Sequence, residues 1–243
     1  MRLEGKCPKN ISYDAWLSGV MGRDVYKLTV DESFMSAVGL VNFYKLHADV
    51  FFYAKVAVDD IAAARFLEEQ GFRLIDTNVL LEKPIERGAT HSCPGVLIRL
   101  AQPQDKDKVK ALAGGCFCFS RFHLDPAVPK DMANKIKAEW AGNFFAGKRG
   151  ECLVVAQKGR DIVGFLQLLD DRKGMITIDL IGVAAGCRQQ GIGAAMVDFA
   201  QAHFSRASKI TVGTQIANVA SLRCYEKLGF RHVQAWYVFH YHG

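Results

Sequence analysis

The stretch ITIDLIGVAAGCRQQGIGAAM, residues 176–196, decides the fold of this chain. Residues 176–183 are largely apolar and β-branched and predict a strand. From Ile192 onward, apolar side chains recur on one side of a predicted helix. The glycine-rich turn between them therefore opens a helix directly after a strand. Unpaired N–H groups and the positive end of the helix dipole meet at such a turn, so it predicts an anion-binding site.

The spacing of the turn narrows the kind of anion site. Gly191 and Gly193 carry no Cβ, so a phosphate can approach the main chain closely, and Arg188 adds a formal charge. A P-loop requires a Lys after its last glycine, and a dinucleotide fingerprint requires a third glycine; neither is present here. A glycine-rich turn without a ligand remains the alternative at this point.

A second group of residues follows about 30 positions later and consists of Asn218, Ser221, Tyr225 and Gly229-Phe230. An Arg-x-x-Gly-x-Gly turn after a strand, followed by this Asn, Ser, Tyr and Gly-Phe pattern, resembles the GNAT acetyltransferases. The resemblance covers residues 95–243. It implies the GNAT fold, an α/β fold with a central mixed, mostly antiparallel twisted sheet flanked by helices. It also implies acetyl-CoA as cosubstrate, acetyl transfer to a primary amine, and no metal.

Two further segments narrow the resemblance. Residues 118–140, with Phe119-Ser120-Arg121-Phe122, and residues 214–225 are similar to the bacterial dTDP-fucosamine acetyltransferases. This group acetylates dTDP-4-amino-4,6-dideoxygalactose during synthesis of a cell-surface glycan. The similarity implies a nucleotide-sugar substrate, a partial N-terminal domain before the GNAT domain, and a homodimer. The chain departs from the group at His123-Leu124-Asp125 and is longer around the glycine-rich turn.

The same family resemblance implies where the cofactor lies. The pantetheine arm is expected to pair with the backbone of residues 181–183, where that strand splays from strand 209–215, and the diphosphate to lie on the turn. The expected contacts are Ile181, Gly182, Val183, Arg188, Gln189, Gln190, Gly191, Ile192, Gly193, Ala194, Asn218 and Cys224.

Tyr225 is the candidate general acid. A phenol is neutral at pH 7, since its usual pKa is near ~10, and can give a proton to a departing thiolate. Asn218 precedes Tyr225 by two helical turns, so both can lie on one helix face. The structural alternatives are an aromatic ring packed against the sheet for Tyr225 and a plain helix N-cap for Asn218.

The acceptor side is less defined by the sequence. Arg121, Phe122 and His123 are the expected substrate contacts, and the planar fork of Arg121 suits a phosphate. Each has a structural alternative, a surface charge for Arg121 and a core position for Phe122. The general base stays open between a water chain and four side chains: His123, Glu139, Asp179 and His240.

The elements around the deciding stretch complete the fold expectation. Strands are predicted at 96–100, 152–156, 162–169, 175–183, 209–215 and 231–241, and helices at 105–112, 129–145, 192–204 and 219–228. The short connections between 152 and 183 predict three antiparallel strands. Residues 83–95 contain two Pro and two Gly and are expected to be a linker.

The first half of the chain contains a partial repeat of the second half. Residues 52–73 and 212–231 both predict a strand, a helix and a closing Gly-Phe-Arg. The first half lacks a glycine-rich anion turn. We therefore expect residues 1–90 to form a partial GNAT-like domain that binds no cofactor, and residues 91–243 to form the acetyltransferase domain.

Composition excludes several other classes of protein. The charge of +6 is spread along the chain, which argues against a nucleic-acid-binding protein and suits an anionic small molecule. Seven scattered cysteines predict a reduced, cytoplasmic protein, and no apolar run predicts membrane insertion. Two functions remain as alternatives: an N-acetyltransferase for a protein N-terminus or another small amine, and a non-catalytic acyl-CoA-binding module.

Overall fold

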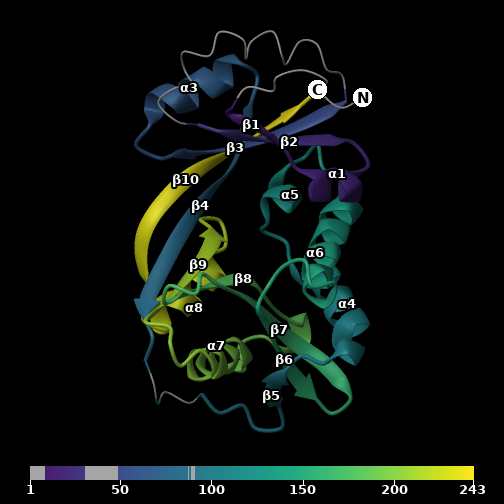
Figure 1. Ribbon diagram of the computed structural model, residues 1–243, viewed down its shortest axis with the longest axis vertical. Coiled ribbons are helices and arrows are strands. Elements are labelled where there is room, and N and C mark those ends of the chain that lie inside the picture. The colour runs from purple at the N-terminus through teal and green to yellow at the C-terminus, as the bar shows by residue number, and fades with distance from the viewer. Residues whose placement is uncertain (1–8, 31–48, 87, 89–90) are drawn as a thin grey trace.

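The computed structural model describes residues 9–30, 49–86, 88 and 91–243. Ten strands form a single sheet in the order β1-β2-β3-β10-β4-β9-β8-β7-β6-β5 (Figure 1). The sheet is mixed, because β2 pairs with β3 and β8 with β9 in parallel, whereas the remaining neighbours are antiparallel. The predicted fold class, a mixed and mostly antiparallel sheet flanked by helices, is confirmed.

The second half of the chain has the predicted element order, with one short additional helix, α5. Its elements are β5 (Leu97–Leu100), η2 (Pro103–Asp105), α4 (Lys106–Cys116), α5 (Arg121–Leu124), α6 (Lys130–Phe145), β6 (Cys152–Lys158), β7 (Asp161–Asp170), β8 (Met175–Val183), η3 (Ala185–Cys187), α7 (Ile192–His203), β9 (Lys209–Gln215), α8 (Val219–Lys227) and β10 (Arg231–His242). Strands β6, β7 and β8 pair antiparallel in sequence, as their short connections predicted.

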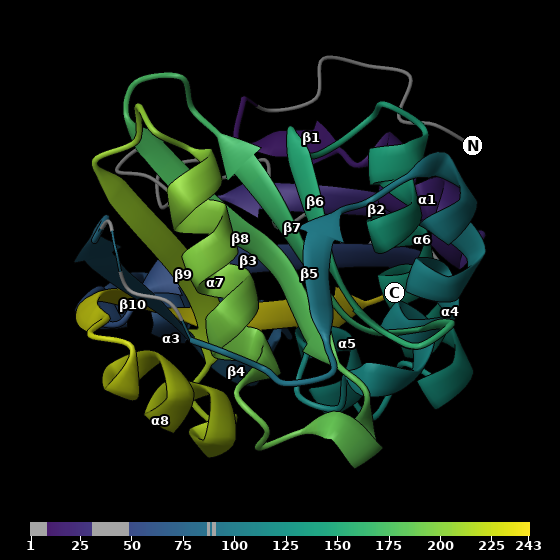
Figure 2. The ribbon, with the colours of Figure 1, turned by 90° about the horizontal axis from the view of Figure 1, so that it is seen from below.

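Helices cover both faces of this half of the sheet (Figures 1 and 2). On one face, α7 and α8 bury apolar side chains such as Met196 and Leu222 against Ile178 and Val212 of the central strands. On the other face, α4 and α6 pack against a separate cluster that includes Phe165. We call this second face the acceptor face, because the predicted substrate residues of α5 lie on the same side as α6.

The first half contributes β1 (Ile11–Tyr13), α1 (Ala15–Met21), β2 (Asp24–Thr29), β3 (Val50–Ala57), α3 (Ile61–Glu69) and β4 (Arg73–Pro84). Strand β4 includes Lys83 and Pro84, so the predicted linker begins too early. Pro84 fits there because it ends the strand, where a missing N–H disturbs the ladder least.

The predicted repeat is visible in the hydrogen bonding. Arg73 and Arg231 each directly follow a Gly-Phe pair. Within the two repeated units, two residues that are as far apart in the sequence as Arg73 and Arg231 occupy equivalent places. Tyr53 pairs with His240 as Thr211 pairs with Glu82. The side chain of Asp60 caps α3 through the Ala63 N–H, and Asn218 caps α8 in the same way through Ser221. The two strand-helix-strand units are therefore related by a local two-fold axis between β4 and β10.

This arrangement interlocks the two halves. Strand β4 lies between β9 and β10, and β10 lies between β3 and β4. β10 runs from the cofactor end of the sheet to the end formed by β1, β2 and β3 (Figure 1). The boundary at residue 90 therefore separates two units of the sequence, but both units contribute strands to one continuous sheet. That the first unit is a domain of its own remains a proposal.

Candidate functional site

The two parallel strands at the centre of the sheet separate at one end. β8 and β9 pair from Met175 and Lys209 only as far as Ile178 and Val212. At the next residue, Asp179, a β-bulge interrupts the pairing with β7, since Gln167 faces Leu180 and Leu168 faces Ile178. Bulges bend a strand and are frequent beside active sites. Beyond the bulge, β8 and β9 diverge. In the part of the chain that the structure describes, no strand pairs with the edge of residues 180–183 that faces β9.

Gly182 in this segment has no space for a side chain. A Cβ at this position would lie 2.5 Å from the Cys116 sulfur and 2.8 Å from the Phe165 ring. The end of α4 therefore packs directly against the backbone of the splayed strand. Glycine is required here because neighbouring atoms come close to the backbone, and not because the backbone has an unusual conformation.

The turn from Arg188 to Gly193 presents main-chain N–H groups to solvent. Gln189 and Gly191 adopt left-handed conformations, with φ of 62° and 78°. Among the described residues, no acceptor bonds to the N–H groups of residues 189–194, and residues 188–191 are exposed. Ile192 is an exception, because its side chain is 1% exposed and anchors α7 in the core. Only its backbone can contact a ligand.

Arg188 differs from the expectation. Its guanidinium donates to the carbonyl of Val183 at 3.1 Å and to that of Cys116 at 2.7 Å. It therefore ties the end of β8 to the end of α4, on the same backbone that was expected to pair with pantetheine. An anion on the turn would meet Arg188 only after these bonds are exchanged.

Helix α8 places three predicted residues at the open end of the splay. Asn218 is the N-cap of α8, so the structural alternative for this residue is present, and its side-chain oxygen accepts from Ser221 N–H at 3.3 Å. Cys224 is exposed as a residue, but its sulfur is partly desolvated, and this raises the pKa of the thiol. Tyr225 is 5% exposed and packs on Phe230 with ring centroids 5.4 Å apart. Burial raises its pKa, so the phenol stays protonated.

The three predicted substrate residues have different surroundings. Arg121 lies over the ring of Tyr53 at 3.9 Å and donates to His240. His123 bonds Ser120 at 2.6 Å and Asn134 at 3.0 Å. Phe122 is 1% exposed and belongs to the core between α1, α5 and α6. Its prediction as a substrate contact is wrong, because a fully buried ring has no surface for a ligand.

The four candidate bases are all engaged in other interactions. Asp179 accepts from Arg149, Trp140 and Gln167, and Glu139 pairs with Lys110 at 2.8 Å. His123 is held by the two hydrogen bonds described above, and burial lowers its pKa.

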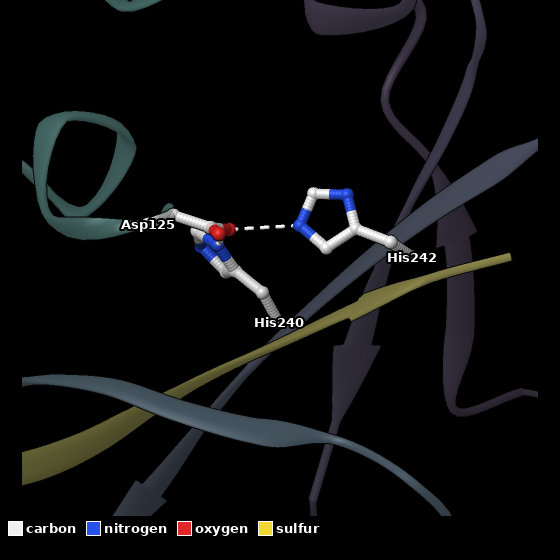
Figure 3. A group of neighbouring side chains, drawn as sticks. All are labelled: Asp125, His240 and His242. Atoms are coloured by element: carbon white, nitrogen blue, oxygen red, sulfur yellow. Dashed lines mark hydrogen bonds and ion pairs between the residues drawn. The ribbon is translucent and has the colours of Figure 1, made fainter. Parts of the chain in front are cut away.

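The fourth candidate, His240, belongs to a chain of hydrogen bonds in which Asp125 accepts from two histidines (Figure 3). His240 and His242 approach the carboxylate at 2.6 and 2.8 Å, and their other ring nitrogens face Arg121 and Arg23. The donor atoms of Asp125 and both histidines lie within 4.8 Å of one another, close enough for a metal ion. Two neighbouring guanidinium groups disfavour a cation there, so the geometry fits a hydrogen-bonded chain better. Burial lowers the pKa of His240 to about 4, which keeps it neutral.

Asp76 is a carboxylate that the sequence analysis missed. It is 6% exposed, and neither side-chain oxygen has a hydrogen-bond partner in the part of the chain that the structure describes. Burial raises its pKa to about 6. Asp76 lies in one cross-strand row with Val238 and Lys55, on the acceptor face. The available signal was the spacing of Asp76 and Asn78 by two residues between the apolar residues 74–75 and 79–81 of the strand, which places both on one face.

Comparison with known proteins assigns this geometry to a family. The family model described as "Acetyltransferase (GNAT) family" matches residues 118–230, which include the bulge, the turn and α8. Residues 118–230 form a GNAT acetyltransferase domain.

Similar proteins cover most of the chain. The spore coat polysaccharide biosynthesis protein SpsD of Bacillus subtilis is 28% identical over 192 residues, 78% of this chain and 66% of SpsD. The chain thus spans slightly less than two thirds of the length of this curated relative. A GCN5-related N-acetyltransferase from Kribbella flavida has a TM-score of 0.61 at 13% identity, over 96% of this chain and 87% of its own. One from Sphaerobacter thermophilus has a TM-score of 0.61 at 14% identity, over 89% and 72%.

No helix among the described residues has both the length and the apolar character needed to cross a bilayer.

Proposed function

We propose that this protein transfers the acetyl group of acetyl-CoA to the amino group of a nucleotide-linked amino-dideoxy sugar. The observation that carries the proposal is the unpaired edge of β8 beside a turn of free N–H groups. A pantetheine arm can pair with such an edge, and a diphosphate can accept from such a turn. The polysaccharide-related name of SpsD supports a glycan precursor as acceptor. A nucleotide-sugar substrate and a homodimer remain inferences from the resemblance described first, and the scattered cysteines still favour a cytoplasmic location.

The chemistry requires two proton transfers. In this proposal, the neutral amine attacks the thioester carbonyl, and a main-chain N–H of the splayed segment donates to the developing oxyanion. Tyr225 would then donate a proton to the departing thiolate of coenzyme A. Because the phenol is buried and protonated, it can act as an acid near neutral pH.

Asp76 is the side chain best suited to receive the proton from the amine. Its carboxylate has no other hydrogen-bond partner among the described residues, and its pKa is near the working pH of a general base. Asp76 comes from β4, so the first half of the chain would complete the site. This would explain why β4 is inserted next to β9.

The test is acetyl-CoA consumption by the purified chain with a panel of acceptors. The panel contains dTDP- and UDP-linked amino sugars, free amino sugars, an N-terminal peptide and a polyamine. We expect the highest kcat/KM with a nucleotide-linked amino sugar. Turnover of the peptide or polyamine alone would replace the proposed acceptor, and binding of acetyl-CoA without turnover of any amine would support the non-catalytic module.

A further inference from the structure

Three cations on the acceptor face lack a carboxylate partner. They are Lys55 on β3, Arg121 on α5 and Lys137 on α6. Within the described ranges, none of them approaches a carboxylate within ion-pair distance, whereas nine other basic side chains do so. Lys137 is 9% exposed and has no hydrogen-bond acceptor among the described residues. An unpaired, buried ammonium group is costly in a protein interior.

Aromatic rings hold all three cations in place. The Lys137 nitrogen lies 4.9 Å from the ring centroids of both Phe117 and Trp140. Arg121 stacks on Tyr53, and the Lys55 nitrogen lies 5.5 Å from the Trp236 ring. Cation–π contacts orient a positive charge without neutralising it, so the charge remains available to an anion.

The nearby acids are already engaged. Asp14 accepts from Tyr53 and from the first turn of α1. Asp125 accepts from two histidines, and Asp179 from Arg149 and Trp140. Asp76 is the one nearby acid that is not engaged in this way. It lies beside Lys55, whose ammonium group donates to the side chain of Asn78 at 3.0 Å. The carboxylates near Arg121 and Lys137 are therefore held by other donors.

The three cations also repel one another. Burial and, to a smaller extent, repulsion by Arg121 together lower the pKa of Lys137 to about 8. Burial and the same Arg121 lower the pKa of Lys55, although this side chain is exposed to solvent. Burial lowers the pKa of Arg121 to about 10.

We propose that Lys55, Arg121 and Lys137 together bind a phosphate or diphosphate group of the acceptor substrate. This inference rests on the proposed function and gives it a chemical class: an acceptor that carries phosphate next to its amino sugar. Arg121 presents a planar pair of donors, and the two lysines add point charges from β3 and α6. Since Lys55 belongs to β3, the first half of the chain would supply part of the phosphate site.

Isothermal titration calorimetry on the full chain, saturated with coenzyme A, tests this proposal. The ligands are inorganic pyrophosphate, dTDP and thymidine. We expect the variants Lys137→Met and Lys55→Met to bind pyrophosphate and dTDP ~10–100-fold more weakly, the loss typical of one charged hydrogen-bonding partner. Thymidine binding should change little. Lys130→Met is the matched control, because Lys130 is an exposed residue at the start of the same helix.

Proton uptake gives a second, independent measurement. A phosphate beside Lys137 should raise its pKa, so dTDP binding at pH 8 should take up to about half a proton from the buffer. The other groups that face Lys137 are Arg121, Asp179 and Cys116. Burial raises the thiol pKa of Cys116 to about 11, so Cys116 remains protonated at this pH. In Lys137→Arg, which stays charged, binding should persist and the uptake should disappear.

The outcomes separate this proposal from the proposed function. Weaker phosphate binding in both lysine variants, together with normal binding by Lys130→Met, supports the site. Equal dTDP affinity in all variants overturns it, and so does a wild-type chain that acetylates amines but binds neither pyrophosphate nor dTDP. If the chain binds dTDP through these lysines but acetylates no amino sugar, the phosphate site is supported and the proposed function is overturned.

Discussion

Tyr225 has a structural role in the core, and in the proposed mechanism it also has a chemical role. Its ring packs on Phe230 in the core beneath α8, and its hydroxyl is desolvated and protonated. The spacing from Asn218 identified Tyr225 in the sequence. The burial that tunes its acidity could not be seen there, because it depends on β4, β9 and β10 packing around the helix.

Replacement of Tyr225 by Phe keeps the packing and removes the proton. We expect kcat to fall by ~100-fold, the typical contribution of a general acid, with little change in the KM for acetyl-CoA. Steady-state release of coenzyme A thiol measures both. Tyr237→Phe, which removes a phenol from β10, should keep full activity, and a Tyr225→Phe enzyme at full rate would exclude Tyr225 as the acid.

Asp76 should make the protein less stable as the pH rises. Its pKa in the folded chain is about 6, above its ordinary value of 3.8, so the folded state holds the proton more tightly than the unfolded state. The penalty is absent below pH ~4 and complete above pH ~6. Asp76→Asn should therefore raise the free energy of unfolding at pH 8 by about 1–3 kcal/mol and leave it unchanged at pH 4. Urea titrations at the two pH values check this, and an equal gain at both would contradict the assigned burial.

The same substitution should change the pH dependence of catalysis. If Asp76 accepts the proton of the amine, kcat/KM falls below pH ~6 in the wild type, because the carboxylate becomes protonated. Asp76→Asn should lower kcat by ~100-fold and remove that acidic limb of the profile. Glu139→Gln, an exposed residue paired with Lys110, is the control. A variant that keeps both its rate and the limb would assign the proton to another group.

The two helix caps, Asp60 and Asn218, offer a matched pair. Each accepts a hydrogen bond from the N–H three residues later, at equivalent positions of the repeat. Asp60→Ala and Asn218→Ala should both reduce the free energy of unfolding by about 1 kcal/mol, the usual value of an N-cap. Only Asn218→Ala should also raise the KM for acetyl-CoA, if Asn218 is a cofactor ligand as well as a cap. Equal kinetics in the two variants would leave Asn218 as a cap alone.

The helices and hairpins of the second half could be predicted because their signals are local. The strands 162–169 and 175–183 follow from apolar runs between short turns, and α6 follows from its four-residue spacing of apolar side chains. Helix α5 has four residues, too few to show a helical period. The insertion of β4 beside β9 depends on pairing between residues far apart in sequence, and no local pattern specifies a strand's partner.

The candidate site, like the fold, could be predicted only where its signal in the sequence is local. The turn and Tyr225 could be proposed from the sequence because a short motif contains them. The cations Lys55 and Lys137 and the carboxylate of Asp76 could be proposed only from the structure, because they come from β3, α6 and β4. Arg121 was proposed from the sequence and is still a proposal, whereas Phe122 proved to be buried, because periodicity cannot separate the faces of a four-residue helix.

The interlocked sheet should make the chain unfold as one unit. Because β10 lies between β3 and β4, neither half can separate without breaking strands of the other. Leu67→Ala in the first core and Val154→Ala in the second should each lower the midpoint of a single transition. Coincident circular dichroism and tryptophan fluorescence curves, with equal calorimetric and van't Hoff enthalpies, would establish this. Two resolved transitions would show that the halves are independent.

The position of β10 also has a consequence during synthesis. Strands β3 and β4 leave the ribosome long before residues 231–242, yet both depend on β10 for an inner neighbour. Until then, their open edges can pair wrongly or attract chaperones. Strands that are translated well before β10 are therefore among the last to reach their native form.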